Sequence, residues 1–255
     1  GIGGDGRLDL GAGPAGRDRV ISLRLADFLD RQESRIRALL ERFGYAPWLE
    51  EFRTYLGDPR LTLEEFWVRY VLLRMQEGPR LDAVKTEAEA REFYRTSEYP
   101  LWRQIVHRRH SAWRRVLWTM KGEHGRLLEI GCGIAPVSAW GSRRKPGWVF
   151  GLRDITQSPH LRYALWRLRG RIECFGYWKI TMALDVFEHL SDPLAAAQRA
   201  VSGLVPDGYL HWTFPETDGT GLDLATPEQR RETIAFLTSR LRTVYERDGY
   251  WVSVK

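Results

Sequence analysis

The sequence predicts an α/β fold, in which a doubly wound, mostly parallel sheet with helices on both faces follows an all-helical N-terminal domain. After Lys121 and Gly122, short apolar segments alternate with helical segments, which is typical of a parallel sheet covered on both sides. Before that point, apolar residues recur at helical spacing and no segment alternates like a strand. A Gly-x-Gly turn directly after the first apolar segment also favours this class, because ligand loops of open α/β sheets lie at strand ends.

The chain divides into three regions on these patterns. Residues 1–19 hold seven glycines and almost no large apolar side chain, so we expect a flexible leader there. Residues 20–121 are expected to form the helical domain, beginning with an apolar stripe from Leu25 to Phe43. Breakers at Pro47, 57–59, 78–79 and Pro100 separate the later helices, of which 63–76 and 101–120 have the strongest patterns. Residues 122–255 are expected to form the α/β domain.

The α/β region predicts five strands, a capped helix and a hairpin. The strands are expected at 126–130, 148–153, 171–175, 178–185 and 209–214. Asp192 and Pro193 are typical of a helix N-cap and first turn. A helix over 226–240 and a hairpin over 243–254, which turns at Asp248-Gly249, are expected to close the chain.

Composition excludes several classes of protein. Hydrophobic residues make up 43% and charged residues 28% of the 255 residues, which is typical of a globular domain and unlike disordered or collagen-like chains. No apolar run reaches the ~18 residues of a membrane span, so the cytoplasm is the expected compartment. The two cysteines, Cys132 and Cys174, provide neither a disulfide framework nor a zinc-ligand cluster. A net charge of +6 permits a nucleic-acid partner without requiring one.

The segment from Leu127 to Pro136 carries the clearest chemical signal. An apolar strand ends in Glu129 and passes into a turn built on Gly131 and Gly133, after which a helix begins. Glycine lets the backbone approach a ligand closely, and a helix N-terminus offers free N–H groups. A dinucleotide site would favour a third glycine where Pro136 stands, so an NAD site is disfavoured. The alternative is a tight strand-to-helix turn without a ligand.

A second segment, Asp185-Val186-Phe187-Glu188-His189-Leu190-Ser191-Asp192-Pro193-Leu194, runs on to Val205-Pro206-Asp207-Gly208. Together with Leu128 to Gly133, it resembles class I S-adenosylmethionine-dependent methyltransferases, and the resemblance covers about residues 122–255. This resemblance implies a Rossmann-like sheet of the methyltransferase type and S-adenosylmethionine as cofactor. It does not indicate an acceptor, because this family methylates small molecules, lipids, proteins and RNA on one scaffold.

The resemblance also implies roles for individual residues. Glu129, Gly131, Cys132 and Gly133 would hold the methionine part of the cofactor, Asp154 the ribose, and Asp185 the methyl end. The third family glycine is replaced by Ala135, and Arg153 stands where the strand-two acid is usual, so Asp154 comes one residue late. The short stretch between Ile172 and Trp178 leaves adenine to Cys174, Phe175 or Tyr177, or to a lid of N-terminal helices.

Each of the other candidate site residues could instead have a purely structural role. His189 and Glu188 could act as catalytic bases, because histidine's ordinary pKa suits proton removal, or His189 could cap a helix. Four aromatic residues could either line a substrate pocket or pack in the core: Phe93, Tyr94, Tyr99 and Trp102. Three of them are predicted to contact the substrate: Tyr94, Tyr99 and Trp102. The basic run 108–110 with Arg114 and Arg115 is most often a solvated helix face. No metal site is predicted, since Glu188 and His189 lack further ligands.

Two hypotheses about function remain open. The first is methyl transfer from S-adenosylmethionine to an O or N nucleophile of a small-molecule acceptor, with residues 20–121 as a lid. The second keeps the cofactor fold but assigns an RNA acceptor, or a degenerate, non-catalytic binding module. The oligomeric state, the acceptor and the methylated atom are not predicted.

Overall fold

The structure is a computed structural model that describes residues 47–107, 113–169, 172–173, 175–214 and 223–255. It divides into two compact units, residues 1–71 and 72–255. The leader 1–19, the first predicted helix around 25–43, Cys174 and the basic run 108–110 lie outside the described residues. Among the described helices, none combines the length and apolar character that crossing a membrane requires.

The first unit contains helix α2 (Pro47–Leu56) and the first part of α3 (Leu63–Asp82). Its core is aromatic: the Phe52 and Phe66 rings meet edge to face at 5.8 Å, and Trp48 contacts Phe66 at 5.1 Å. The predicted break at Gly78-Pro79 is wrong, because α3 continues through Pro79 to Asp82. Proline removes one backbone hydrogen bond and its ring crowds the carbonyl four residues earlier, so continuing the helix through Pro79 costs stability without ending the helix.

The second unit contains a six-stranded sheet in the order β2-β1-β3-β4-β6-β5. Its strands are β1 (Gly125–Ile130), β2 (Trp148–Arg153), β3 (Trp178–Ala183), β4 (Leu204–Thr213), β5 (Arg242–Arg247) and β6 (Tyr250–Val254). The first four are parallel, and β6 pairs antiparallel with both β4 and β5. This order confirms the predicted doubly wound, mostly parallel sheet and the closing hairpin.

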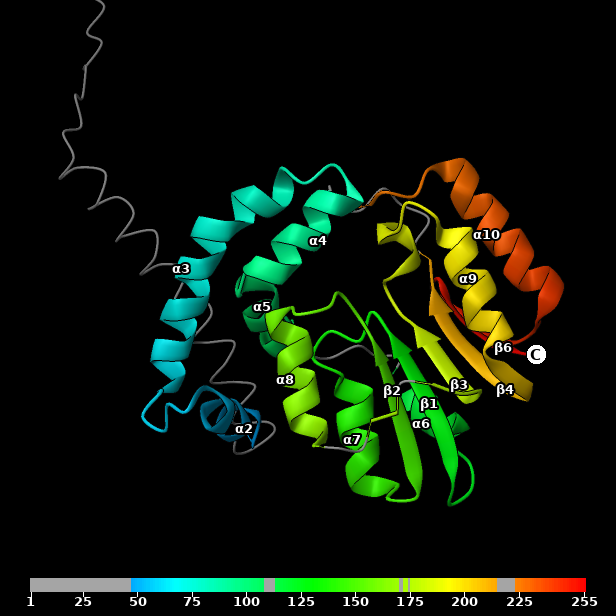
Figure 1. Ribbon diagram of the computed structural model, residues 1–255, viewed down its shortest axis with the longest axis horizontal. Coiled ribbons are helices and arrows are strands. Elements are labelled where there is room, and N and C mark those ends of the chain that lie inside the picture. The colour runs from blue at the N-terminus through cyan, green and yellow to red at the C-terminus, as the bar shows by residue number, and fades with distance from the viewer. Residues whose placement is uncertain (1–46, 108–112, 170–171, 174, 215–222) are drawn as a thin grey trace, which may run out of the picture. The chain divides into compact units, whose positions relative to one another are not determined.

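Helices cover both faces of this sheet (Figure 1). They are α6 (Trp113–Thr119), α7 (Pro136–Arg144), α8 (Pro159–Leu168), α9 (Pro193–Ser202) and α10 (Pro227–Arg240). Helices α4 (Glu87–Thr96) and α5 (Tyr99–His107) contact α8, and a short 3-10 turn η1 (Phe187–His189) precedes α9. Val116 of α6 and Val137 of α7 pack with Phe150 and Ile180 of the sheet. On the other face, α9 and α10 pack against Leu210 and Trp212 of β4. The predicted helix 101–120 corresponds to α5 and α6.

Among the described residues of the predicted strand 171–175, which are 172, 173 and 175, only Ile172 forms a bridge, with Phe150, so the prediction of a strand is wrong for these residues. The chain then turns back to the amino end of β3, where the Arg126 guanidinium donates to the Phe175 carbonyl and pairs with Glu173. The following side chains are exposed as a result, with Phe175 at 87% and Tyr177 at 67%.

A buried histidine fastens α6 to the sheet. His211 of β4 contacts the Thr119 hydroxyl at 2.8 Å through Nε2 and the Tyr250 hydroxyl at 2.6 Å through Nδ1. Burial lowers the pKa of His211 to about 3, so the ring is neutral at pH 7 and offers one donor and one acceptor. This network joins α6, β4 and β6 beneath the carboxyl ends of the strands.

Candidate active site

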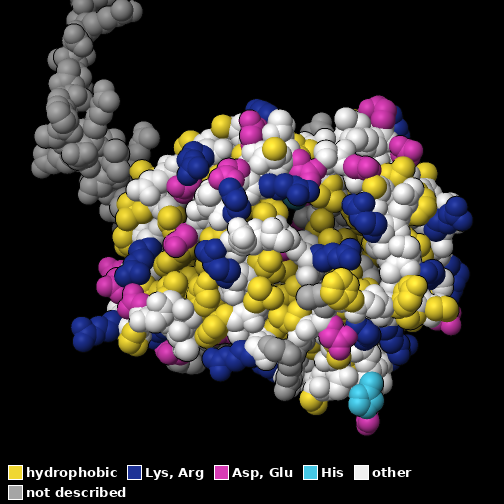
Figure 2. Space-filling model, viewed as in Figure 1, with side chains coloured by type: hydrophobic (Ala, Val, Ile, Leu, Met, Phe, Trp, Pro, Cys, Tyr) yellow, Lys and Arg dark blue, Asp and Glu magenta, His cyan; other side chains and the backbone are white. Residues whose placement is uncertain are grey.

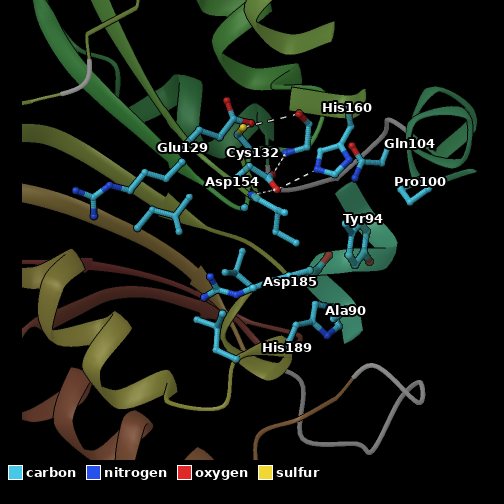
Figure 3. A pocket seen from close by; sticks show the side chains of 18 of the residues that line it. Ala90, Tyr94, Pro100, Gln104, Glu129, Cys132, Asp154, His160, Asp185 and His189 are labelled. Carbon is cyan, nitrogen blue, oxygen red and sulfur yellow. Dashed lines mark hydrogen bonds and ion pairs between the residues drawn. The ribbon is translucent and has the colours of Figure 1, made fainter. Parts of the chain in front are cut away.

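A cavity of about 990 Å³ lies in the second unit, where the chain leaves β1, β2 and β3. Its walls include Gly131–Ile134 after β1, Asp154–Thr156 after β2 and Leu184–Val186 after β3, while α4 and α5 add Tyr94 and Tyr99 (Figure 3). Ligands of open α/β sheets bind at this edge, outside the carboxyl ends of the strands. The cavity is therefore the candidate active site.

The glycine loop after β1 is closed by internal hydrogen bonds. The amides of Gly131 and Cys132 donate to the Arg153 carbonyl at 2.8 and 3.2 Å, and that of Ala135 donates to the Cys132 carbonyl at 2.6 Å. Side chains accept from the other two amides: Asp154 Oδ2 from Gly133 N at 2.6 Å and Gln104 Oε1 from Ile134 N at 2.9 Å. Each of these five successive amides already has an acceptor. The loop is consequently not a cradle for phosphate, which depends on free backbone N–H groups.

Both loop glycines are required by geometry. Gly131 and Gly133 have φ values of +61° and +50°, in the left-handed region that favours glycine. A Cβ at Gly131 would lie 2.4 Å from Val186, and one at Gly133 would lie 2.2 Å from the Gln104 side chain. Side chains from after β3 and from α5 therefore pack directly on the loop backbone.

Glu129 lies beneath this loop and is 2% exposed. Its Oε2 accepts from Ser138 N at 3.0 Å and from Ser138 Oγ at 2.5 Å, which ties the end of β1 to the first turn of α7. Burial raises the pKa of Glu129 to about 7, although the Ser138 bonds act in the opposite direction. Glu129 also lines the cavity, and its role in binding a cofactor stays a prediction.

Asp154 turns toward the glycine loop from the end of β2. Besides the bond from Gly133 N, its Oδ1 accepts from Ile155 N at 2.7 Å and lies 3.0 Å from His160 Nε2. Burial acts to raise the pKa of Asp154, but the hydrogen bond from His160 and the backbone donors hold that pKa below its ordinary value. The strand β2 pairs regularly with β1 up to Arg153, and Asp154 directly follows it.

His160, at the start of α8, was missed by the sequence analysis. It is 1% exposed, lines the cavity, and meets the Tyr94 ring edge to face at 5.7 Å (Figure 3). Its Nε2 also lies 3.1 Å from Ser158 Oγ, whereas Nδ1 has no hydrogen-bond partner among the described residues. With Nε2 donating to Asp154, the buried Nδ1 is an acceptor available to a ligand.

Asp185 lies in the cavity wall directly after β3, as predicted. Its φ of +53° is unusual for a residue other than glycine, although aspartate tolerates this region better than most. Thr213 of β4 stabilises the conformation, because its Oγ1 accepts from Asp185 N at 2.6 Å and donates to Asp185 Oδ1 at 2.9 Å. The neighbouring strand thus fixes where this carboxylate points.

His189 lines the cavity, and a carboxylate that the sequence analysis missed holds it in place. Asp223 Oδ1 lies 3.3 Å from His189 Nδ1, and Asp223 Oδ2 accepts from Arg230 Nη2 at 3.1 Å. Because 34 residues separate His189 from Asp223, no local motif joins them. A histidine whose Nδ1 is oriented by a carboxylate can take a proton at Nε2.

Several predicted residues lie outside the cavity wall. Glu188 is 2% exposed and faces the protein interior, and Trp102 and Phe93 are buried at 3% and 4%. Phe175 cannot serve an adenine site, because it precedes β3 and so lies at the amino edge of the sheet, opposite the glycine loop. Arg115, from the predicted basic face, stacks over Tyr245 of the hairpin at 4.2 Å.

The substitution Glu188→Gln is expected to raise the free energy of unfolding at pH 8. Burial raises the pKa of Glu188 from 4.5 to about 7, so the folded state binds more protons than the unfolded state between these values. The group's stabilising contribution is present below about pH 4.5 and is lost as the pH rises to about 7. The gain should be on the order of 2 to 3 kcal/mol at pH 8 and vanish near pH 4.

Urea unfolding of the parent and variant at pH 4, 6 and 8 would measure this difference. Glu232→Gln, on an exposed part of α10, controls for the loss of one charge. A constant difference between the Glu188 variant and the parent at all three pH values would contradict the assignment.

Solved structures with a similar fold include methyltransferases. An O-methyltransferase family protein from Burkholderia thailandensis is 13% identical, with 74% of this chain and 70% of that chain covered and a TM-score of 0.49. Magnesium protoporphyrin IX methyltransferase from Synechocystis PCC 6803, solved with S-adenosylhomocysteine, is 15% identical over 67% of this chain and 100% of that chain, also at 0.49. The [4+2]-cyclase SpnF is 19% identical over 56% and 61%, at 0.42.

At these identities the similarity is one of fold. No protein-family model matches the sequence, and a search of curated proteins found no match. In the part of the chain that the structure describes, no group of three or more His, Cys, Asp or Glu side chains could hold a metal ion. The function is therefore argued from the cavity itself.

Proposed function

We propose that this protein is an S-adenosylmethionine-dependent methyltransferase that acts on an O or N nucleophile of a small-molecule acceptor. The observation that carries the proposal is the closed glycine loop, which lies at the carboxyl edge of a doubly wound sheet and has no free amide for a phosphate. Nucleotide cofactors with phosphates are disfavoured at such a loop. S-adenosylmethionine carries a nucleoside without any phosphate, so it needs close packing rather than free amides.

The residues present fit this cofactor. The unpartnered Nδ1 of His160 can accept from a ribose hydroxyl, and Asp154 has lone pairs left beyond its three protein donors. Gly131 and Gly133 let Val186 and Gln104 pack on the loop backbone, so the Gln104 amide lies beside the site that we propose for the methionine part. We assign the ribose to the Asp154 and His160 pair and the methionine part to the loop.

The chemistry requires little of the protein beyond alignment and proton removal. When bound, the cofactor's sulfonium supplies an electrophilic methyl group and leaves as a neutral thioether. His189 Nε2 takes the proton from the acceptor's hydroxyl or amine, and Asp223 stabilises the resulting imidazolium through Nδ1. Asp185 is held in place by its hydrogen bonds with Thr213 and lies between the proposed cofactor site and the proposed acceptor site. Glu188 is buried, with its Oε1 3.9 Å from His189 Nε2, and it has no catalytic role in this proposal.

A small-molecule acceptor fits the cavity. Its volume of about 990 Å³ lies at the upper end of the range typical for small-ligand sites, ~300 to 1,000 Å³. Tyr94 and Tyr99 reach it from α4 and α5, which belong to the region predicted to form a lid, residues 20–121. We propose that these two helices select the acceptor. Trp102 and Phe93 support them as core residues rather than as substrate contacts.

Binding of S-adenosylhomocysteine tests the proposal most directly. At ~100 times its dissociation constant the ligand is expected to raise the free energy of unfolding by ~2.7 kcal/mol. NAD and ATP at the same concentration serve as controls and should give no shift, because the loop amides are already bonded. Thermal unfolding with and without each ligand provides the measurement. Equal shifts for all three ligands, or none for S-adenosylhomocysteine at millimolar concentration, would refute the cofactor assignment. Binding without turnover of any acceptor would favour a non-catalytic module.

A further inference from the structure

The cavity wall contains equal numbers of basic and acidic residues, but only some of these residues have hydrogen-bond partners within the protein. Five arginines and five acids line the cavity: Arg91, Arg95, Arg103, Arg153 and Arg199, with Glu87, Glu92, Glu129, Asp154 and Asp185. Figure 2 shows Lys and Arg side chains dispersed among hydrophobic and acidic side chains on one face of the molecule. The hydrogen bonds of these ten residues decide which charges remain available to a ligand.

Every acid in the wall already has a donor within the protein. Glu87 pairs with Arg91 and Ser191, and Glu92 pairs with Arg95. Glu129, Asp154 and Asp185 accept from Ser138, from the Gly133 loop and His160, and from Thr213, as described above. Two of the five arginines are therefore used by acids of their own helix, α4.

The guanidinium groups of Arg103, Arg153 and Arg199 make no hydrogen bond or ion pair with another described residue. They come from three separate elements, α5, the end of β2 and α9, yet all line one cavity. All three are exposed, so they lie at its rim. Unpaired guanidinium groups gathered at one opening are suited to carboxylate or phosphate groups, which they can bind through two parallel hydrogen bonds.

Arg199 lies on the acceptor side of this opening. It is three residues after Ala196 on α9, so both face the cavity, which His189 and Leu190 also line. Arg153 and Arg103 are adjacent in sequence to Asp154 and Gln104, which belong to the proposed cofactor side. The single carboxylate of the cofactor can use one of these two. The other of these two stays on the cofactor side, whereas Arg199 lies on α9, which contacts the turn η1 that carries the proposed base.

We propose that the acceptor is an anion, which carries a carboxylate or phosphate group, and that Arg199 binds this group while His189 faces the nucleophile. This inference rests on the proposed function, since it assigns one side of the cavity to the cofactor. It specifies the class of acceptor that the fold leaves open. Neutral acceptors of the same shape would leave Arg199 unpaired and are expected to bind weakly.

The test uses protein saturated with S-adenosylhomocysteine, so that the cofactor's carboxylate is already in place. Benzoate and phenyl phosphate are titrated by calorimetry beside the neutral benzamide, and affinities are compared for the parent, Arg199→Gln and Arg231→Gln. Arg231 is exposed on α10, pairs with Glu228 and does not line the cavity, so its variant is matched in charge. We expect an anionic probe to bind the parent roughly tenfold or more tightly than benzamide. Arg199→Gln should abolish this preference and Arg231→Gln should keep it.

A preference for benzoate would identify a carboxylate acceptor, and a stronger one for phenyl phosphate a phosphate ester. The proposal is overturned if no anionic probe binds above benzamide, or if the Arg199 and Arg231 variants behave alike. Failure of S-adenosylhomocysteine itself to bind would count against the proposed function instead. The two failures are thus distinguishable in one set of titrations.

Discussion

The substitution Gly133→Val is expected to abolish stabilisation by S-adenosylhomocysteine while leaving the protein folded. Gly133 has a φ of +50°, and its Cβ position lies 2.2 Å from the Gln104 side chain, which is flexible enough to be displaced. A branched side chain would therefore push Gln104 out and project over the loop where the cofactor must approach. Backbone strain and overpacking together should weaken binding by about 100-fold or more. Calorimetric titration of both proteins gives this ratio.

Gly249→Val is a matched control for this experiment. Gly249 also has a positive φ, +70°, but no atom lies within 4 Å of its Cβ position, and it turns the hairpin between β5 and β6. Both variants carry a similar backbone strain, but only Gly133→Val also displaces a neighbouring side chain, so its melting temperature should fall at least as far as that of Gly249→Val. Only the Gly133 variant should lose the ligand. If Gly133→Val bound S-adenosylhomocysteine as the parent does, the glycine loop would not be the methionine site.

Replacing His189 by alanine is expected to lower turnover by about 10²- to 10⁴-fold, the usual contribution of a general base. The affinity for S-adenosylhomocysteine should not change, because His189 lies beyond Asp185 from the glycine loop. The rate should also lose its fall at low pH, since that fall reflects protonation of the base. Initial rates over a range of pH, measured with an acceptor that the parent enzyme turns over, check both statements.

The substitution Asp223→Asn tests whether Asp223 only orients the His189 ring or also stabilises its protonated form. It keeps the size of the side chain that lies 3.3 Å from His189 Nδ1 but removes the charge that stabilises the imidazolium. We expect a smaller loss in rate than for His189→Ala and a shift of the low-pH limb to lower pH values, because the imidazolium loses the carboxylate that stabilises it. An unchanged pH profile in both variants would show that another group removes the proton.

Local sequence signals predicted much of the sheet. The bounds of β2 agree with the predicted 148–153, because apolar residues run from Trp148 until the exposed Arg153. The Asp248-Gly249 turn lies between β5 and β6 as expected, since both residues adopt positive φ. These features depend on neighbours in the sequence, which is why pattern and turn chemistry suffice for them.

The errors come from contacts distant in sequence. Residues 171–175 have the composition of a strand, but Arg126 of β1 binds this segment at the amino edge and turns it toward β3. His160 and Asp223 became site residues only because Asp154 and His189 lie beside them in space. Each pairing depends on how elements pack, and no motif in one stretch of chain reports it.

The hydrogen bonds of the glycine loop also bear on the thermodynamics of ligand binding. Because Gly131 to Ala135 have their amide partners before any ligand arrives, the conformational entropy of this loop is lost during folding rather than during binding. A ligand that enters need not order the backbone that it touches, so more of its contact energy is retained as affinity. The expected signature is a binding entropy dominated by release of water, with little contribution from the chain.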